Sequence, residues 1–220
     1  MYMPSFKNKK KGNVKLNTII YLFMFAMGVV LGSFYTLAVY RIPLKQDITH
    51  TRSYCPKCNH ALDFFDLIPV LSYIFLGGKC RYCKEKIRPR YLIIELFSGV
   101  VFTLFAIILN IDILNIEIQK IATLVFGIFF LSTIFIQVGI FNEYKKINKS
   151  VFNFGIVISL IYMIYLCILK TSIYRHIICI ILLLGMLIIN NLKKQKELLR
   201  VISFIIFALI GFLEIGITII

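Results

Sequence analysis

Long apolar runs alternate with short polar segments along almost the whole chain, and this alternation is the dominant pattern in the sequence. A helix needs roughly 20 apolar residues to cross the hydrocarbon core of a bilayer. A lipid-facing backbone must also satisfy its own hydrogen bonds, which favours helices over open sheets. We therefore predict an all-α polytopic membrane protein with about six transmembrane helices. The runs are residues 17–40, 92–109, 121–141, 151–169, 173–189 and 201–220.

The composition agrees with a location in a membrane. Hydrophobic residues make up 60% of the chain and charged residues 16%, and the mean hydropathy is +0.88. A soluble domain of this length does not need so much apolar surface. The net charge of +15 is concentrated before residue 17, in residues 41–90 and in two later loops. Basic residues beside membrane spans contact anionic headgroups, so we expect membrane lipids as partners and no nucleic acid.

The basic segments also predict the orientation of the chain. Residues 41–90 hold ten Lys or Arg, and further basic clusters follow the third and fifth runs. The positive-inside rule places these three segments in the cytoplasm, which puts the amino terminus outside. The lysines of the amino-terminal tail disagree with that orientation, and one misassigned span would invert part of the topology. They are Lys7, Lys9, Lys10, Lys11 and Lys15.

The segment between the first two runs contains two CxxC pairs separated by 21 residues. The four cysteines are Cys55, Cys58, Cys80 and Cys83. This spacing is close to that of zinc ribbons, in which four thiolates hold one tetrahedral zinc ion. A cytoplasmic segment keeps its thiols reduced and favours metal ligation, whereas disulfides are the alternative outside the cell. We predict a structural zinc site, and we expect Cys167 and Cys179 to be ordinary buried thiols.

These patterns divide the chain into four parts. The first run is interpreted as a span and not as a cleavable signal peptide, because it lacks a small-residue cleavage site. The parts are a basic tail (1–16), the first transmembrane helix (17–40), a cytoplasmic zinc-knuckle domain (41–90) and a five-helix transmembrane bundle (91–220).

Several short motifs run through the first span and the cysteine segment. They are GSF at 32–34, YRIP at 40–43, SYCPKC at 53–58, LIPVLSY at 67–73, LGGKCRYC at 76–83, IRPRY at 87–91 and EL at 95–96. In these motifs the chain resembles the amino-terminal part of bacterial type IV prepilin peptidases. These are membrane aspartic enzymes of the A24 family that also methylate the trimmed pilin. The remainder of the chain matches only in its alternation of spans and basic loops.

This resemblance implies a location, partners and cofactors. The location would be the bacterial inner membrane, with the cysteine segment, similar to the A24 amino-terminal domain, in the cytoplasm. The partners would be pilin-like precursors with a short basic leader before an apolar helix. Methyl transfer would use S-adenosylmethionine, although no glycine-rich donor motif is visible in the sequence.

The resemblance also implies two catalytic aspartates, whose positions fall near Phe141 and Asn191. No Asp follows Asp112 anywhere in the chain. In such a dyad one carboxylate takes a proton from water while the other, protonated, polarises the scissile carbonyl. Asparagine does not titrate near neutral pH, and phenylalanine neither titrates nor forms the required hydrogen bonds. We therefore predict that the proteolytic dyad is lost.

Three glutamates are the remaining candidates for chemistry. Glu143 and Glu197 follow cytoplasmic helix ends and could form a substitute pair, but both also fit as solvated charges among lysines. Glu95 lies about a turn inside the second run, where an acid is costly unless it faces the protein interior or water. Nearby, Gly32 and Ser33 would let another helix pack closely against the first span.

Two classes of function follow. The chain is expected to be a prepilin peptidase-like protein that acts on type IV pilin-like precursors by leader processing or methylation, with the aspartate dyad lost. The alternative is a non-catalytic pseudoenzyme that binds prepilins or serves as a scaffold in a pilus, secretion or competence system. Hydrolysis by the chain would favour the first class, and binding without hydrolysis would favour the second.

Overall fold

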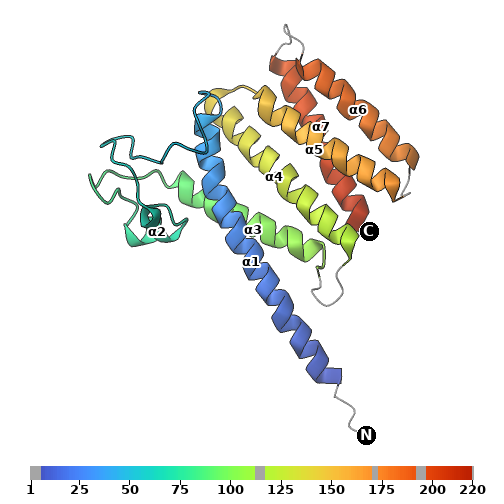
Figure 1. The fold of residues 1–220 in the computed structure, drawn as a ribbon, viewed down its shortest axis with the longest axis horizontal. Coiled ribbons are helices and arrows are strands. Elements are labelled where there is room, and N and C mark those ends of the chain that lie inside the picture. The colour runs from blue at the N-terminus through green and yellow to red at the C-terminus, as the bar shows by residue number, and fades with distance from the viewer. Residues whose placement is uncertain (1–5, 112–116, 170–172, 192–196, 220) are drawn as a thin grey trace. The chain divides into compact units, whose positions relative to one another are not determined.

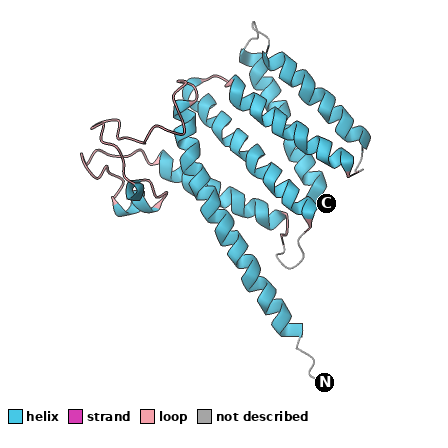
Figure 2. Cartoon of the chain, viewed as in Figure 1, coloured by secondary structure: helices cyan, strands magenta, loops and turns pink. Residues whose placement is uncertain are grey.

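The computed structural model describes residues 6–111, 117–169, 173–191 and 197–219, and the structural statements below concern these residues. Their helices are shown in Figure 1. In chain order they are α1 (Phe6–Arg41), the 3-10 helix η1 (Phe64–Asp66), α2 (Leu71–Phe75), α3 (Arg90–Ile108), α4 (Ile118–Tyr144), α5 (Lys149–Ile168), α6 (Ile173–Asn191) and α7 (Glu197–Ile219). Within the described ranges no strand is present, and pairing between extended residues is limited to two isolated β-bridges (Figure 2).

Six helices within the described ranges are long and apolar enough to cross a membrane. They are α1 from Asn17 onward, α3, α4, α5, α6 and α7. The prediction of an all-α polytopic membrane protein is thereby confirmed. Helix α7 begins at Glu197, four residues before the apolar run that predicted it, and Glu197 forms an ion pair with Arg200 in this first turn. Hydropathy cannot reveal such a polar first turn.

The predicted basic tail is only partly described, since its first five residues lie outside the described ranges, as does Asp112. From Phe6 the chain is already helical and continues into the first span as α1. The chain divides into two compact units, Met1–Ile116 and Glu117–Ile220.

The first unit is built on the packing of α1 against α3, which run antiparallel and side by side (Figure 1). On α1, Gly28 lies directly against Ser98 and Gly99 of α3. Gly32 lies against Ser98 and Glu95 of α3, and neither glycine contact on this helix leaves room for a side chain. The Ser98 hydroxyl donates a hydrogen bond to the Gly28 carbonyl at 2.7 Å. Small residues allow this close approach of two membrane helices. The predicted packing role of Gly32 is therefore confirmed.

The second unit consists of α4 to α7 around an aromatic core. Phe130 and Phe152 are fully buried and their rings lie 5.4 and 5.5 Å from that of Phe207 on α7. Phe126 stacks on Tyr162 with ring centroids 4.1 Å apart. Offset and edge-to-face aromatic packing of this kind stabilises helix contacts where no hydrophobic effect drives association in lipid.

Candidate functional site

The two cysteine pairs form matching turns in the segment between α1 and α3. In the first turn the Cys55 N–H bonds the His60 carbonyl and the Asn59 N–H bonds the Cys55 carbonyl. In the second, the Cys80 N–H bonds the Glu85 carbonyl and the Lys84 N–H bonds the Cys80 carbonyl. Asn59 and Lys84 both have positive φ, at 56° and 58°. Both turns therefore follow the same backbone path and present their cysteines in the same way.

The four cysteine sulfurs lie within 4.8 Å of one another, so the predicted quartet comes together. A Zn–S distance of about 2.3 Å in a tetrahedron places the sulfurs about 3.8 Å apart. The Cys55 and Cys83 sulfurs are separated by 3.8 Å. All six cysteines of the chain are free thiols. The residues therefore fit one zinc ion held by Cys55, Cys58, Cys80 and Cys83.

The thiols differ in their tendency to ionise. Hydrogen bonds from the backbone N–H of Cys58, and secondarily of Lys57, lower the pKa of the Cys55 thiol to about 7, although burial opposes this effect. The Glu85 N–H lowers the pKa of Cys83, but burial and the neighbouring thiols outweigh it and raise the pKa to about 11. Adjacent thiols resist joint ionisation, and a cation among them relieves that resistance.

The second turn is tied to η1 by side chains from each. Arg81 forms an ion pair with Asp66 at 2.6 Å, and the Tyr82 hydroxyl donates to Asp63 at 2.9 Å. The Tyr82 ring also lies against His60 of the first turn, with centroids 3.6 Å apart. The two cysteine turns and η1 are therefore one connected structure.

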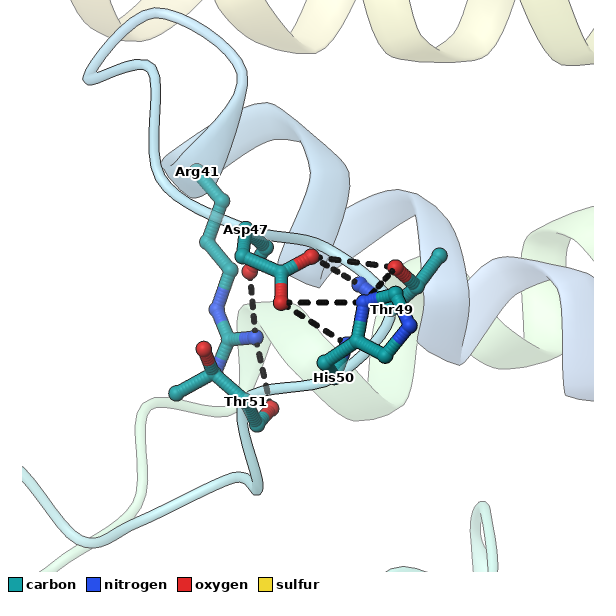
Figure 3. Close-up of polar contacts among 5 residues, drawn as sticks. All are labelled: Arg41, Asp47, Thr49, His50 and Thr51. Atoms are coloured by element: carbon teal, nitrogen blue, oxygen red, sulfur yellow. Dashed lines mark hydrogen bonds and ion pairs between the residues drawn. The ribbon is translucent and has the colours of Figure 1, made fainter.

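Arg41, the last residue of α1, organises the loop that follows it (Figure 3). It is only 5% exposed, and its Nη1 donates to the Asp47 and Thr51 carbonyls at 2.9 and 2.8 Å. Its Nη2 donates to the Arg52 carbonyl at 3.2 Å. Hydrogen bonds, first of all from the Thr49 N–H, lower the pKa of the Asp47 carboxyl. The loop thus closes around a planar guanidinium that reaches three carbonyls.

Replacement of Arg41 by Lys should loosen this loop, because one ammonium cannot reach three carbonyls in the same geometry. We expect a loss of about 2 kcal/mol in local stability. Hydrogen exchange of the amides of residues 47–52 measures it, and Arg52→Lys serves as the control. Arg52 is exposed and contributes only its backbone carbonyl to the Arg41 contact. Equal exchange in both variants would contradict this role of Arg41.

Glu95 is a buried acid of α3 that is only 8% exposed, and its contacts connect parts of the first unit. Its Oε2 accepts a hydrogen bond from the Val70 N–H at 2.7 Å. Val70 precedes α2 and has φ +63°, a conformation that a β-branched residue rarely adopts. The Ser33 hydroxyl also bonds the Glu95 carboxylate. The acid therefore joins the cysteine segment to both helices of the first unit.

The positions predicted for the catalytic aspartates lie in the second unit. Phe141 is in the last turn of α4, and Asn191 ends α6. The Asn191 Oδ1 accepts a hydrogen bond from Asn153 of α5 at 3.0 Å. Asn190 is fully buried and donates to Asn153 at 2.7 Å. Amide side chains thus connect α5 and α6 at the second position, and none of them titrates near neutral pH.

The surroundings of the two substitute acids are also described. Glu143 is exposed near the end of α4. Glu197 opens α7, where the helix dipole favours an acid, and pairs with Arg200. Asn148 caps α5 by accepting hydrogen bonds from the Ser150 and Val151 amides. The participation of Glu143 and Glu197 in catalysis stays a prediction.

Sequence reasoning missed a buried ionic cluster between α6 and α7. Glu214 is 2% exposed and lies 3.3 Å from the His176 ring and 3.4 Å from Arg175. The rule that ionisable residues inside spans are functional candidates would have found this cluster.

The expectation that Cys167 and Cys179 are ordinary buried thiols is wrong, since both are partly exposed and Cys179 donates to Glu214. Lipid, and not protein, can cover such positions in a membrane helix.

Comparison with known proteins gives matches to the first unit. Residues 26–109 match the family described as the bacterial peptidase A24 N-terminal domain. Proteins named prepilin leader peptidase/N-methyltransferase are similar to about a third of the chain. That of Vibrio cholerae is 43% identical over 86 residues, covering 35% of this chain and 34% of the relative. That of Bacillus subtilis is 43% identical over 79 residues, covering 36% and 32%.

A third relative with the same name, from Myxococcus xanthus, is 41% identical over 81 residues, covering 37% of this chain and 24% of the relative. The chain thus spans about a quarter to a third of the length of these curated relatives. No solved structure matches the chain. The similarity extends over the α1–α3 pair and the cysteine segment between them.

Proposed function

We propose that the chain is a prepilin peptidase-like protein that binds type IV pilin-like precursors, because residues 26–109 match the family described as the bacterial peptidase A24 N-terminal domain. In this proposal it does not hydrolyse them through an aspartate dyad. The observation that carries the proposal is the contrast between its two units. The first matches the family model and brings together four cysteines that could hold a metal ion, whereas the second has Phe141 and Asn191 where the resemblance implies the acids.

The chemistry of these side chains supports binding without hydrolysis. Leader cleavage needs one carboxylate that accepts a proton from water and one that donates to the carbonyl. The Asn190 and Asn191 side chains both form hydrogen bonds with Asn153, and none of these three amides titrates near neutral pH. Zinc would hold the two cysteine turns together, and the proposed location is the bacterial inner membrane with this segment in the cytoplasm. Methylation with S-adenosylmethionine rests on the family resemblance alone.

A processing assay tests the proposal. The chain is co-expressed with candidate prepilins in a bacterial host that lacks other prepilin peptidases, and the precursor is followed by its change in mass. We expect no leader removal by the wild type, together with co-purification of the full-length precursor. The matched control is the same pilin without its leader, which should not co-purify.

Two variants identify any residual hydrolysis. If the wild type removes leaders and Glu143→Gln or Glu197→Gln abolishes removal, substitute carboxylates are at work and the non-hydrolytic proposal is wrong. If the wild type neither processes nor retains any precursor, the binding proposal is wrong. A mass increase equal to one methyl group on a pre-trimmed pilin would identify methyl transfer as the activity of the chain.

A further inference from the structure

The segment between the two cysteine pairs carries a group of large apolar side chains that the described residues of the first unit leave exposed. Five large side chains within residues 64–75 are at least half exposed, and we call them the η1–α2 apolar face. They are Phe64 (76%), Phe65 (70%), Leu71 (50%), Ile74 (60%) and Phe75 (82%). Single exposed apolar residues are ordinary, but a contiguous group marks a surface that meets another apolar phase.

The position of α2 along the axes of α1 and α3 indicates that this apolar phase is the membrane. The Val70 N–H, directly before α2, is bonded to Glu95, which lies five residues after Arg90 at the start of α3. At 1.5 Å per residue this is about 8 Å inside α3. On α1, Gly32 packs against Glu95, nine residues before Arg41, or about 14 Å from the helix end. The start of α2 therefore lies beside the spans and not beyond their ends.

Charges at the end of α2 complement a membrane surface. The chain returns alongside α2 through a β-bridge between Lys79 and Lys86 and a hydrogen bond from the Ile87 N–H to Gly78. This places three exposed cations, Lys79, Lys86 and Arg88, next to the apolar face. Apolar and aromatic side chains beside Lys and Arg are typical of elements that lie in the headgroup region of an anionic bilayer.

We propose that the η1–α2 apolar face is inserted into the boundary between headgroups and acyl chains, with Lys79, Lys86 and Arg88 against anionic headgroups. Glu95 is the positioning residue, because it holds the Val70 amide at this depth. The zinc turns, joined to η1 through Arg81 and Tyr82, then rest on the membrane surface. This inference places one face of the predicted cytoplasmic segment 41–90 against the membrane, and it does not depend on the proposed function.

Single tryptophans test the insertion, because the chain contains no Trp. The full chain with Phe75→Trp is reconstituted in vesicles of phosphatidylcholine and phosphatidylglycerol. Its fluorescence is measured with lipids brominated in the acyl chains and, separately, with aqueous iodide. The control is His50→Trp, whose side chain is 90% exposed in the loop after α1. We expect brominated lipid to reduce Phe75→Trp emission about twofold, with little effect of iodide, and the reverse for His50→Trp.

Two results would overturn the proposal. Iodide quenching of Phe75→Trp equal to that of His50→Trp would place the face in water. Protection of Phe75→Trp from both quenchers would mean that protein covers the face in place of lipid. Phe64→Trp on η1 repeats the measurement at a second position, so a disturbance caused by one substitution does not decide the outcome.

The role of Glu95 is tested in the Phe75→Trp background. Glu95→Gln retains a side-chain oxygen that can accept from the Val70 N–H, whereas Glu95→Ala does not. We expect lipid quenching to persist in Glu95→Gln and to fall in Glu95→Ala, with a matching rise in iodide quenching. Unchanged quenching in Glu95→Ala would show that the acid does not position the segment. Zinc content, measured in both variants, confirms that the cysteine turns remain folded.

Discussion

Replacement of Cys55 and Cys80 by Ser is expected to lower the zinc content of the purified chain from about one ion per molecule to none. Each substitution removes a ligand from a different turn, and serine does not replace a thiolate in a zinc-ribbon site. The binding of structural zinc is coupled to folding, with apparent free energies of about 10–16 kcal/mol in small zinc peptides. Elemental analysis of the chain in detergent measures the loss, and Cys167→Ser in α5 is the matched control.

The effect should spread from the cysteines to the membrane contacts of the segment. Without zinc the second turn no longer fixes Arg81 and Tyr82, which are the partners of Asp66 and Asp63 at η1. Limited proteolysis should therefore cut residues 47–86 faster in the double variant, while α1 and α3 remain paired. A wild-type chain that purifies without metal and with oxidised cysteine pairs would instead establish the disulfide alternative.

The candidate spans and the cysteine quartet could be predicted because each depends on a property that is visible in the sequence. A lipid environment forces apolar runs of sufficient length into helices, so hydropathy located all six candidate spans. The two CxxC pairs predicted the quartet because each pair is a local turn whose geometry is set by spacing. The spans therefore follow from local composition, and each cysteine pair follows from a short local turn.

The contacts that position the site could not be predicted, because their partners are backbone groups. Arg41 binds the carbonyls of Asp47, Thr51 and Arg52, and Glu95 binds the Val70 amide. Every residue offers a carbonyl, so sequence alone does not indicate which ones an arginine will reach. Glu95 was recognisable as an unusual acid within a span, but its partner emerged only from the fold.

The exposure of the η1–α2 apolar face could not be predicted from the sequence either. The LIPVLSYIF stretch is too short to span a membrane, and a short apolar run in sequence can equally be a buried core element. Exposure of Phe75 at 82% together with the depth of Val70 distinguishes the two. The basic residues of 41–90 predict a cytoplasmic segment, but they carry no information about the exposure of this apolar stretch.

Replacement of Gly32 by Ala should disrupt the α1–α3 pair although only one methyl group is added. A Cβ at this position would lie 2.9 Å from the Glu95 Cα and 3.1 Å from the Ile94 carbonyl oxygen. Both are backbone atoms of α3, so the helices must separate and lose small-residue packing along the seam. We expect a destabilisation of about 2–3 kcal/mol, seen as a lower Tm in detergent.

Gly185→Ala in α6 is the matched control, because among the described residues an added Cβ would meet nothing within 4 Å apart from its own neighbours in the helix. Alanine is the better helix former, so this variant should be neutral or more stable by about 0.5–1 kcal/mol. Gly32→Ala should also displace Glu95 and speed hydrogen exchange at the Val70 amide, which Gly185→Ala leaves unchanged. Equal Tm values for the two variants, with Val70 exchange unaltered, would mean that α1 and α3 are not held by close contact at Gly32. The depth assigned to α2 would then lose its reference on α1, because that depth is measured from the same contact.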